Sequence, residues 1–205
     1  MKHRDIIKII PGQFKGQELE AEFSRVLSNE IAAKTLFEEA KKKLLSVNNW
    51  HKVAGAITAR FQIIDQRGNE VYREVEKGDY LRIDIPGPGS KEGDGYDWVL
   101  VEELKEINKA SLQSVGFRVR PNENPFSKKN ETAHFYSKET TSTFIVTREN
   151  AKVFSWIVDR NLLPNTESES LVDRVRDVVV GVSGIAGFSK VQWQGLADGL
   201  IEQKD

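Results

Sequence analysis

Six short runs of alternating apolar and polar residues, following one another without an intervening helix, constrain the fold of this chain more than any other feature. The runs lie at residues 58–63, 80–85, 96–104, 112–120, 143–148 and 153–158. A period of two is typical of a β-strand that buries one face. Because parallel neighbours would need long crossover connections, we predict an antiparallel meander.

Two segments precede this meander. Residues 20–30 alternate imperfectly and fit either a strand or a helix; we favour a strand. Residues 33–47 then show apolar side chains three and four positions apart, with glutamates early and lysines late, which indicates an amphipathic helix that ends at Asn48-Asn49. The apolar positions of this helix are Ala33, Leu36, Phe37, Ala40, Leu44 and Val47.

The C-terminal region predicts a second, longer helix. Thr166 and Glu169 have the spacing of a capping box at its start. Its apolar face consists of Leu171, Val175, Val178, Val179, Val182 and Ile185. Gly181, Gly184 and Gly187 near its end indicate a kink or a close approach to another group. Ser189 and Gln192 offer a second capping box, which predicts a separate short helix through Trp193 to Leu200.

The remaining stretches predict connections. Residues 121–132 are polar, and residues 87–95 are rich in glycine, so both indicate loops. Residues 1–19 hold a short apolar run closed by Pro11-Gly12 and are interpreted as an N-terminal extension. We expect residues 20–205 to form a single domain.

A strand, a helix that ends near a tryptophan, about six antiparallel strands and a long C-terminal helix form an order that resembles the START-like or helix-grip superfamily. The resemblance spans about residues 20–203 and rests on the 33–47 helix, the Asn49-Trp50-His51-Lys52 turn, the alternating strands and the 171–186 helix. It implies an α+β fold in which a curved antiparallel sheet of about six or seven strands wraps around the C-terminal helix. The superfamily includes polyketide cyclases, lipid-transfer domains, pollen-allergen-like ligand carriers and co-chaperone domains.

The composition argues against several classes of function. Thirty basic and 31 acidic residues leave a net charge of −1, so no field attracts nucleic acid. The absence of cysteine excludes disulfides and thiolate chemistry, and it fits a reducing, cytoplasmic compartment. No apolar stretch reaches the length of a membrane span, and the N-terminus lacks a signal-peptide core, so we expect neither an integral membrane protein nor a secreted one.

The usual catalytic and metal-binding motifs are also missing. The three histidines, His3, His51 and His134, have no metal-site spacing, so we expect no metal and no cofactor. The 87–95 loop lacks the lysine and hydroxyl ending of a phosphate-binding loop. Glu102 and Glu103 are adjacent on a strand, so they point to opposite faces and are not an acid–base pair.

The resemblance directs attention to the space between the sheet and the C-terminal helix, which is the usual place for an apolar pocket. His134 and Tyr136 are candidate catalytic residues. Candidate ligand-binding residues are Trp98, Phe117, Arg118, His134, Phe144, Trp156, Gly181 and Gly184. For each aromatic residue the alternative is a packed core position, and for Arg118 with Arg120 the alternative is a solvated outer face. Trp50 is predicted to be a structural anchor.

Three hypotheses follow. The first is binding of a small, largely apolar molecule, lipid-like or polyketide-like, in a cavity bordered by the 87–95 and 121–132 loops. The second is an enzyme of the cyclase or dehydratase type that uses His134 with Arg118 or Tyr136. The third is a co-chaperone-like module whose working surface is an exposed apolar patch. No oligomeric state is predicted.

Overall fold

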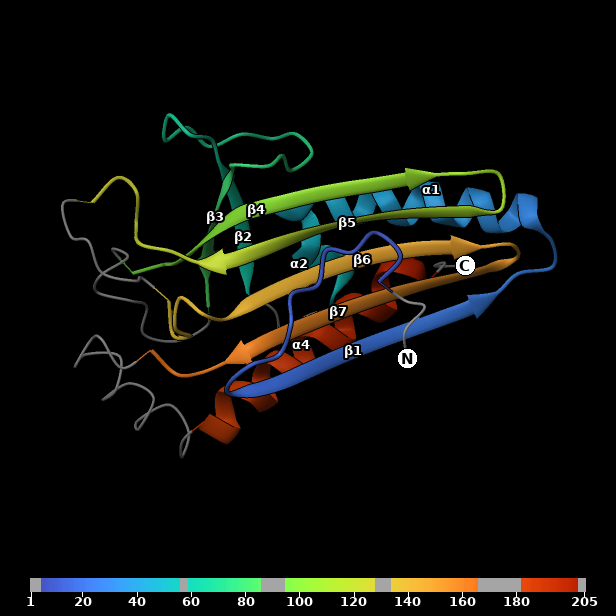
Figure 1. Cartoon of the computed structure of the whole chain (residues 1–205). Coiled ribbons are helices and arrows are strands. Elements are labelled where there is room, and N and C mark those ends of the chain that lie inside the picture. Colours follow the sequence, from blue (N-terminus) through green and yellow to red (C-terminus); the bar gives the residue numbers. More distant parts are fainter. Residues whose placement is uncertain (1–4, 56–58, 86–94, 128–133, 166–181, 203–205) are drawn as a thin grey trace.

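The computed structural model describes residues 5–55, 59–85, 95–127, 134–165 and 182–202, and within this part of the chain the architecture is a sheet with helices on one face (Figure 1). The elements are β1 (Gln17–Val26), α1 (Glu30–Leu45), η1 (Val47–Asn49), α2 (Trp50–Val53), β2 (Arg60–Ile64), β3 (Tyr80–Asp84), β4 (Asp97–Asn108), β5 (Leu112–Pro121), β6 (Thr141–Glu149), β7 (Lys152–Leu162) and α4 (Val182–Ile201). The predicted α+β class is confirmed.

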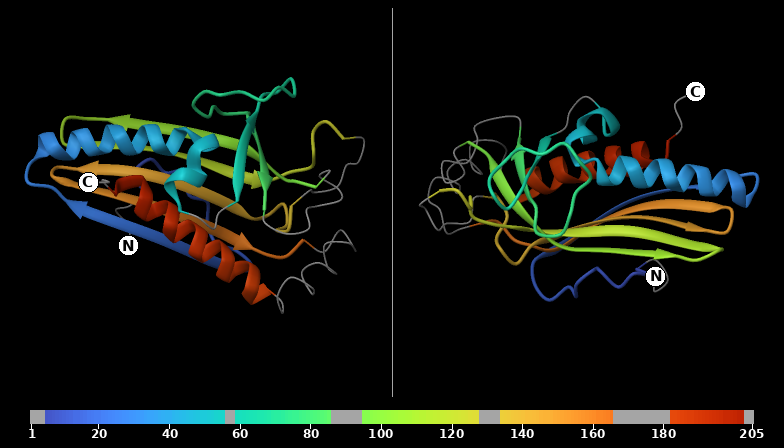
Figure 2. Two further views of the ribbon diagram at one scale, coloured as in Figure 1. Left: turned by 180° about the vertical axis from the view of Figure 1, so that it is seen from behind. Right: turned by 90° about the horizontal axis from the view of Figure 1, so that it is seen from above.

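The seven strands form one antiparallel sheet in the order β1-β7-β6-β5-β4-β3-β2. Strands β2 to β7 are therefore a meander, as predicted, and β1 completes the sheet beside β7. Helices α1 and α4 cover one face of the curved sheet, which we call the inner face (Figure 2). This arrangement is the helix-grip fold.

Helix α1 has a defined start and a single buried face. The Asn29 side chain caps it by accepting a hydrogen bond from the backbone N–H of Ala32 at 2.9 Å. The predicted apolar positions from Ala33 to Leu44 are buried, and Val47 follows in η1. The helix begins three residues earlier than predicted, because Asn29 supplies a cap that the apolar spacing does not show.

Trp50 lies at the centre of the inner-face core. It is 1 % exposed, and its indole N–H donates to the carbonyl of Leu44 at 3.0 Å. Its ring contacts Phe61, Phe117 and Phe144, at centroid distances of 5.1, 5.8 and 4.7 Å. Trp50 thus anchors the end of α1 to three strands of the sheet, as predicted for a structural residue.

The opposite, outer face of the sheet is covered by the N-terminal segment, which crosses it (Figure 2). Ile7 and Ile9 are buried against Ile145, Trp156 and Val158. The segment is held in shape by Asp5, whose carboxylate accepts hydrogen bonds from the backbone N–H groups of Ile9 and Ile10. This cover explains why several strands carry apolar residues on both faces.

Helix α4 differs from the prediction in one respect. It runs without a break from Val182 to Ile201, so Ser189 lies inside the helix and the predicted second start there is wrong. Its buried residues are Ser189, Gln192, Trp193, Leu196, Ala197, Leu200 and Ile201. Gly195 allows a close approach to α2, since an added Cβ would lie 2.6 Å from the carbonyl oxygen of Ala54.

Two of the predictions for the C-terminal region fall on residues that the structure does not describe. The Thr166 capping box and the apolar face from Leu171 to Val179 lie outside the described ranges, as do the side chains of Val182 and Ile185. Among the described residues, no helix is long and apolar enough to cross a membrane.

Candidate functional site

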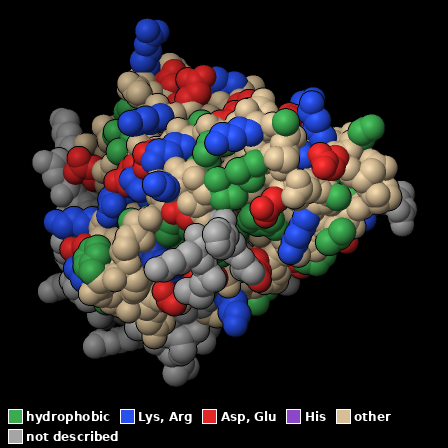
Figure 3. Space-filling model, turned by 45° about the vertical axis from the view of Figure 1, so that its right-hand side comes forward, with side chains coloured by type: hydrophobic (Ala, Val, Ile, Leu, Met, Phe, Trp, Pro, Cys, Tyr) green, Lys and Arg blue, Asp and Glu red, His purple; other side chains and the backbone are tan. Residues whose placement is uncertain are grey.

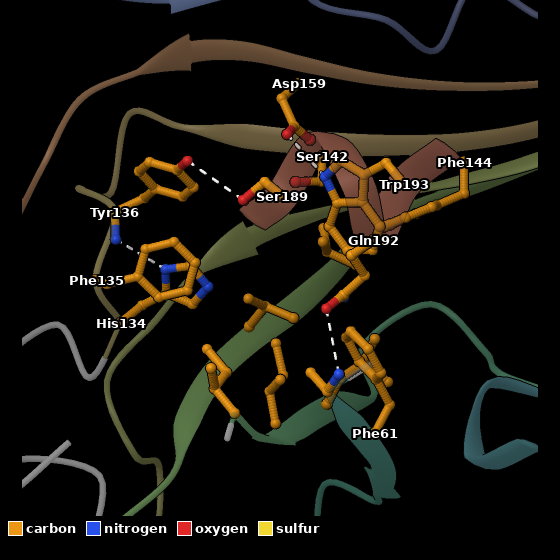
Figure 4. Close-up of a pocket in the computed structure, with 16 residues that line it drawn as sticks. Phe61, His134, Phe135, Tyr136, Ser142, Phe144, Asp159, Ser189, Gln192 and Trp193 are labelled. Carbon is orange, nitrogen blue, oxygen red and sulfur yellow. Dashed lines mark hydrogen bonds between the residues drawn. The ribbon is translucent and has the colours of Figure 1, made fainter. Parts of the chain in front are cut away.

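The candidate site is a cavity between the inner face of the sheet and the first half of α4, closed on one side by residues 134–136 (Figure 4). The space open to the centre of a water molecule is about 40 Å³. The total space between the lining side chains that no protein atom fills is about 530 Å³, and this volume includes bulk solvent at the open side. A space of this kind holds several waters or a compact ligand.

One wall of the cavity is apolar. It is built from side chains on the inner face of β2 to β5, together with aromatic residues of β6 and α4. Alternation along each strand turns every second residue to the same face, which makes this wall continuous. Its members are Ala59, Phe61, Leu81, Ile83, Ile85, Val99, Val119, Phe144 and Trp193.

The other side of the cavity is polar, and we call it the polar cluster. Its members are His134, Tyr136, Ser142, Asp159, Ser189 and Gln192, which come from β6, β7, α4 and the segment before β6. Gln192 accepts a hydrogen bond from the backbone N–H of Ala59 at 3.2 Å, so it also ties α4 to the start of β2. Figure 4 shows Asp159, Ser142 and Ser189 close together, with Tyr136 directed toward Ser189 and with Gln192 reaching across toward the strand of Phe61.

Asp159 is the carboxylate of the polar cluster and is almost completely buried. It is 1 % exposed, and its Oδ2 accepts a hydrogen bond from the indole N–H of Trp193 at 2.9 Å. Its Oδ1 has no hydrogen-bond partner among the described residues. Burial raises the pKa of Asp159 to about 6, although the nearby hydroxyl of Ser142, the hydrogen bond from Trp193 and the charge of Arg160 act in the opposite direction. A buried carboxyl with such a pKa is typical of a functional site.

His134 is a neutral side chain in this environment. Its Nδ1 accepts the backbone N–H of Tyr136 at 3.0 Å, which leaves the proton of the neutral ring on Nε2. Burial lowers the pKa of His134 to about 3. Its Nε2 is 3.9 Å from Asp97 Oδ2, beyond hydrogen-bond distance. With Nδ1 engaged and Nε2 protonated, His134 is a hydrogen-bond donor and does not serve as a general base.

Tyr136 presents its hydroxyl to the start of α4. The hydroxyl lies 3.4 Å from Ser189 Oγ, at the outer limit of a hydrogen bond. Burial and the nearby charge of Asp159 raise the pKa of Tyr136, so the phenol stays protonated. It is therefore a neutral donor at the edge of the cavity.

The segment that carries these two side chains is fixed by backbone pairing with the chain after β7. Ser137 N–H donates to Leu163 at 2.9 Å, and Asn165 N–H donates to Phe135 at 2.9 Å. The Asn165 side chain donates to the His134 carbonyl at 3.0 Å. His134 and Tyr136 are thus held in place without belonging to a strand of the sheet.

Two of the eight predicted ligand-binding residues, His134 and Phe144, line the cavity, and so does the catalytic candidate Tyr136. Phe117 lies on the same face but packs against Trp50 in the solid core. Gly181 lies outside the described residues, as do the side-chain surroundings of Gly184.

Trp98, Arg118 and Trp156 lie on the outer face, so the expectation that they face the cavity is corrected. Their positions on β4, β5 and β7 have the opposite parity to the inward residues. Arg118 donates to Glu102 at 2.9 Å and to the carbonyl of Ile9 at 2.8 Å, which holds the N-terminal segment on that face. The outer-face interpretation of Arg118 is therefore the correct one, and a pairing with His134 in catalysis is excluded.

Five residues of the site were not predicted from the sequence: Asp159, Ser142, Ser189, Gln192 and Trp193. For Asp159 a signal exists, because it continues the inward positions Ser155 and Ile157 of β7. An acidic residue at an inward position of a buried strand needs either a partner or a function. Among the described residues, no three side chains are grouped to hold a metal ion.

Comparisons with known proteins bear on the fold alone. No protein-family model and no curated protein matches the chain. Several solved structures resemble it. One is a hypothetical protein of Helicobacter pylori, with 12% identity, coverage of 93% of this chain and 91% of that chain, and a TM-score of 0.48. Two others are ginseng major latex-like protein 151 of Panax ginseng, with 10% identity, coverage of 89% and 97%, and a TM-score of 0.38, and truncated norcoclaurine synthase of Thalictrum flavum, with 10% identity, coverage of 95% and 100%, and a TM-score of 0.37. The last two are helix-grip proteins, the architecture that the topology of this chain shows by itself. At these identities and TM-scores, the likenesses assign no ligand and no activity.

Proposed function

We propose that the protein binds a small, largely apolar molecule in the cavity between the sheet and α4. This proposal rests on one observation: the cavity combines a continuous apolar wall with a buried polar cluster. Within that cluster, Asp159 Oδ1 has no hydrogen-bond partner among the described residues. Apolar pockets with a few convergent polar groups are the usual form of a small-molecule site.

Both sides of the cavity favour a ligand over water. Moving an apolar body from water onto the wall releases roughly 25 cal/mol for each Å² of apolar surface that is buried. At the polar cluster, a ligand donor would satisfy Asp159, and a ligand acceptor would receive a hydrogen bond from the hydroxyl of Tyr136 or from Nε2–H of His134. The apolar part would supply most of the affinity, and the polar cluster would set the orientation.

The dimensions favour a compact ligand. An apolar cavity of about 150 Å³ accepts a molecule the size of benzene. The comparable volume here, the space open to the centre of a water molecule, is about 40 Å³, so even a single ring would have to occupy the open side as well, and a long acyl chain is too large. Within the two ligand classes that the sequence suggests, the geometry therefore supports the ring compound.

A pair of matched variants tests the proposal. Ala59→Leu adds a side chain in the cavity wall, whereas Ala21→Leu adds the same side chain to the packed core under α4; both positions are at most 2 % exposed. Thermal-shift and tryptophan-fluorescence titrations with single-ring and two-ring compounds should show binding to the wild type and to Ala21→Leu, and a loss of at least tenfold in Ala59→Leu. If no such compound binds the wild type, or if both variants bind equally, the proposal is wrong.

A second candidate function is catalysis, and one observation favours it. Asp159 combines deep burial with a pKa raised to about 6, which suits a general base near neutral pH. In such an enzyme Asp159 would take a proton from the bound molecule, and Tyr136 would donate a hydrogen bond to the same molecule. His134 would then not be the base, and Arg118 would take no part in the reaction. Asp159→Asn would then keep binding and lose turnover, and equal turnover in that variant would rule out this role.

The third hypothesis, a protein-interaction module, receives less support from the surface. On the face shown in Figure 3, basic and acidic side chains are interspersed with small groups of hydrophobic ones. The exposed large apolar residues among those described are Phe14, Phe23, Val26, Ile31, Tyr72, Phe126 and Val191. Phe23 and Val26 both lie on β1, and the other five come from separate segments of the chain. A docking surface of the expected kind would need a continuous patch.

A further inference from the structure

We infer that the ligand of this cavity carries a cationic nitrogen, an ammonium or amidinium group, that binds Asp159 Oδ1 between the aromatic side chains of the site. This inference rests on the proposed function and narrows it to a class of ligand. Two independent observations lead to it: the surroundings of the carboxylate and the arrangement of the rings.

The carboxylate of Asp159 faces no cation from the described elements packed around it. It accepts a hydrogen bond from Trp193 of α4, and its charge acts on Tyr136. His134 and Ser189 line the same cavity, and all four side chains are neutral. Ser142 of β6 adds a hydroxyl. The inward neighbour on β1 is Leu19, which pairs with Asp159 across the sheet.

Arg160 is adjacent in sequence, but its side chain lies on the outer face. It is bound there by Glu18 at 3.2 Å and Glu20 at 2.8 Å. Its positive charge is therefore already balanced by two carboxylates. A buried carboxylate that lacks a facing cation is costly, because it has lost its water without gaining a counter-ion.

Aromatic rings border the cavity on both sides of this carboxylate. Phe135 and Tyr136 lie with centroids 4.4 Å apart on one side, and Phe144 and Trp193 lie 5.2 Å apart on the other. Figure 4 shows Asp159 above the gap between these two pairs, with Phe61 across the cavity. Ring faces attract a cation, and the attraction increases when the cation is removed from water.

A neutral donor would meet only part of this requirement. A hydroxyl would satisfy the hydrogen-bonding capacity of Oδ1 but would leave the carboxylate charge unbalanced. A cationic nitrogen satisfies both, and charge-assisted hydrogen bonds are about twice as strong as neutral ones. The carboxylate and the rings thus favour an ammonium attached to a compact apolar body.

The protonation of Asp159 gives this inference a distinct pH dependence. A cation binds the ionised carboxylate, whereas burial raises the pKa of that carboxyl to about 6 in the free protein. Cation affinity should therefore be constant above about pH 7 and fall roughly tenfold for each pH unit below 6. His134 and Tyr136 keep their neutral forms across this range, so they add no slope.

Three probes of nearly equal shape test the inference: benzylamine, which is cationic at neutral pH, benzyl alcohol and toluene. Binding to the wild type is measured by calorimetry at pH 5 and pH 7.5, and also to Asp159→Asn and to Glu102→Gln. Glu102 is a matched control because its carboxylate lies on the outer face, paired with Arg118 and Arg120. Circular dichroism and thermal unfolding establish that each variant is folded.

We expect benzylamine to bind the wild type ten- to a hundredfold more tightly than the neutral probes at pH 7.5. This preference should shrink by about tenfold at pH 5, disappear in Asp159→Asn and persist in Glu102→Gln. If all three probes bind equally, or if Asp159→Asn keeps the preference, the cation site is wrong while the proposed binding function stands. If none of the three binds, both proposals fail.

Discussion

The two ends of the inner face are built on the same strands but differ in what fills them. At the end covered by α1, Val146 of β6 and Ile157 of β7 belong to the packed core. Phe144 of β6 lies at the border, because it contacts Trp50 and also lines the cavity. The next inward positions toward the other end are Ser142, two residues before Phe144 in β6, and Asp159, two residues after Ile157 in β7. A cavity opens at these two positions. A regular sheet thus supports both a packed core and a site, and the residues at a few inward positions decide which one forms.

The largest expected effect concerns the packed end. Trp50→Ala would remove a fully buried ring that contacts three strands, so it should lower the free energy of unfolding by about 3–5 kcal/mol. Urea denaturation followed by circular dichroism measures this loss. A change below 1 kcal/mol would show that the packed end does not depend on Trp50, and the comparison between the two ends would fail.

The next effect is at the cavity end, where His134 is buried in its neutral form. Because the folded pKa, about 3, lies below the unfolded value, the unfolded state binds more protons between pH 3 and 6.5. The contribution of His134 to the free energy of unfolding of the wild type is complete above pH 6.5 and is lost as the pH falls toward 3. His134→Asn keeps an acceptor for the Tyr136 N–H but does not titrate. The stability of this variant relative to wild type should rise by about 3 kcal/mol from pH 7 to pH 4.

Denaturant titrations at several pH values measure this change. His51→Asn is the control, because His51 is partly exposed in the short helix α2, outside the cavity. If the free energy of unfolding of His134→Asn depends on pH in the same way as that of the wild type, His134 is exposed to water, and residues 134–136 do not close the cavity.

Asp159 should act in the opposite direction, with a somewhat smaller effect. Its folded pKa, about 6, lies above the unfolded value, so the folded state binds more protons between pH 3.8 and 6. Stability from this residue therefore falls as the pH rises through that window. The stability of Asp159→Asn relative to wild type should increase by about 2 kcal/mol between pH 4 and pH 7. An unchanged difference across this range would show that the carboxyl is not desolvated.

The smallest effect is expected on the outer face. Arg118 is paired with both Glu102 and Glu103 in a partly exposed network and contacts the N-terminal segment. The prediction that these two glutamates point to opposite faces is wrong, because the pairing of β4 with β5 shifts register between Val101 and Glu103. Arg118→Gln should lower stability by about 1 kcal/mol or less and leave binding in the cavity unchanged. A loss of ligand binding without loss of stability would instead place this guanidinium in the site.

Several features of the fold were predictable because they depend on local patterns. The six alternating runs correspond to β2 through β7, and the spacing from Ala33 to Val47 corresponds to α1 and η1. Trp50 was identified as an anchor because it lies where the helix meets the first of these strands. The break assigned at Ser189 failed because a capping sequence inside an apolar pattern does not end a helix whose face is buried against a sheet.

The site was predictable only in part, and the reason is the two-sided character of the strands. Alternation places Phe144 and Trp156 on opposite faces, but it does not say which face the helices cover. The N-terminal segment covers the outer face with Ile7 and Ile9, so large apolar residues occur on both sides. Trp98, Arg118 and Trp156 were assigned to the cavity for this reason.

The sequence by itself determined the strand order along the chain, the position of α1 and the absence of cysteine chemistry, since these depend on residue type and spacing. Only the tertiary structure decided which face is inner, and that Asp159, His134 and Tyr136 meet at one end of it. Asp159 and Ser189 are 30 positions apart and Tyr136 is 23 before Asp159, so no local pattern relates them. Their proximity, and the desolvation that shifts their pKa values, arise from β7 pairing with β6 while α4 packs on β7 and β1.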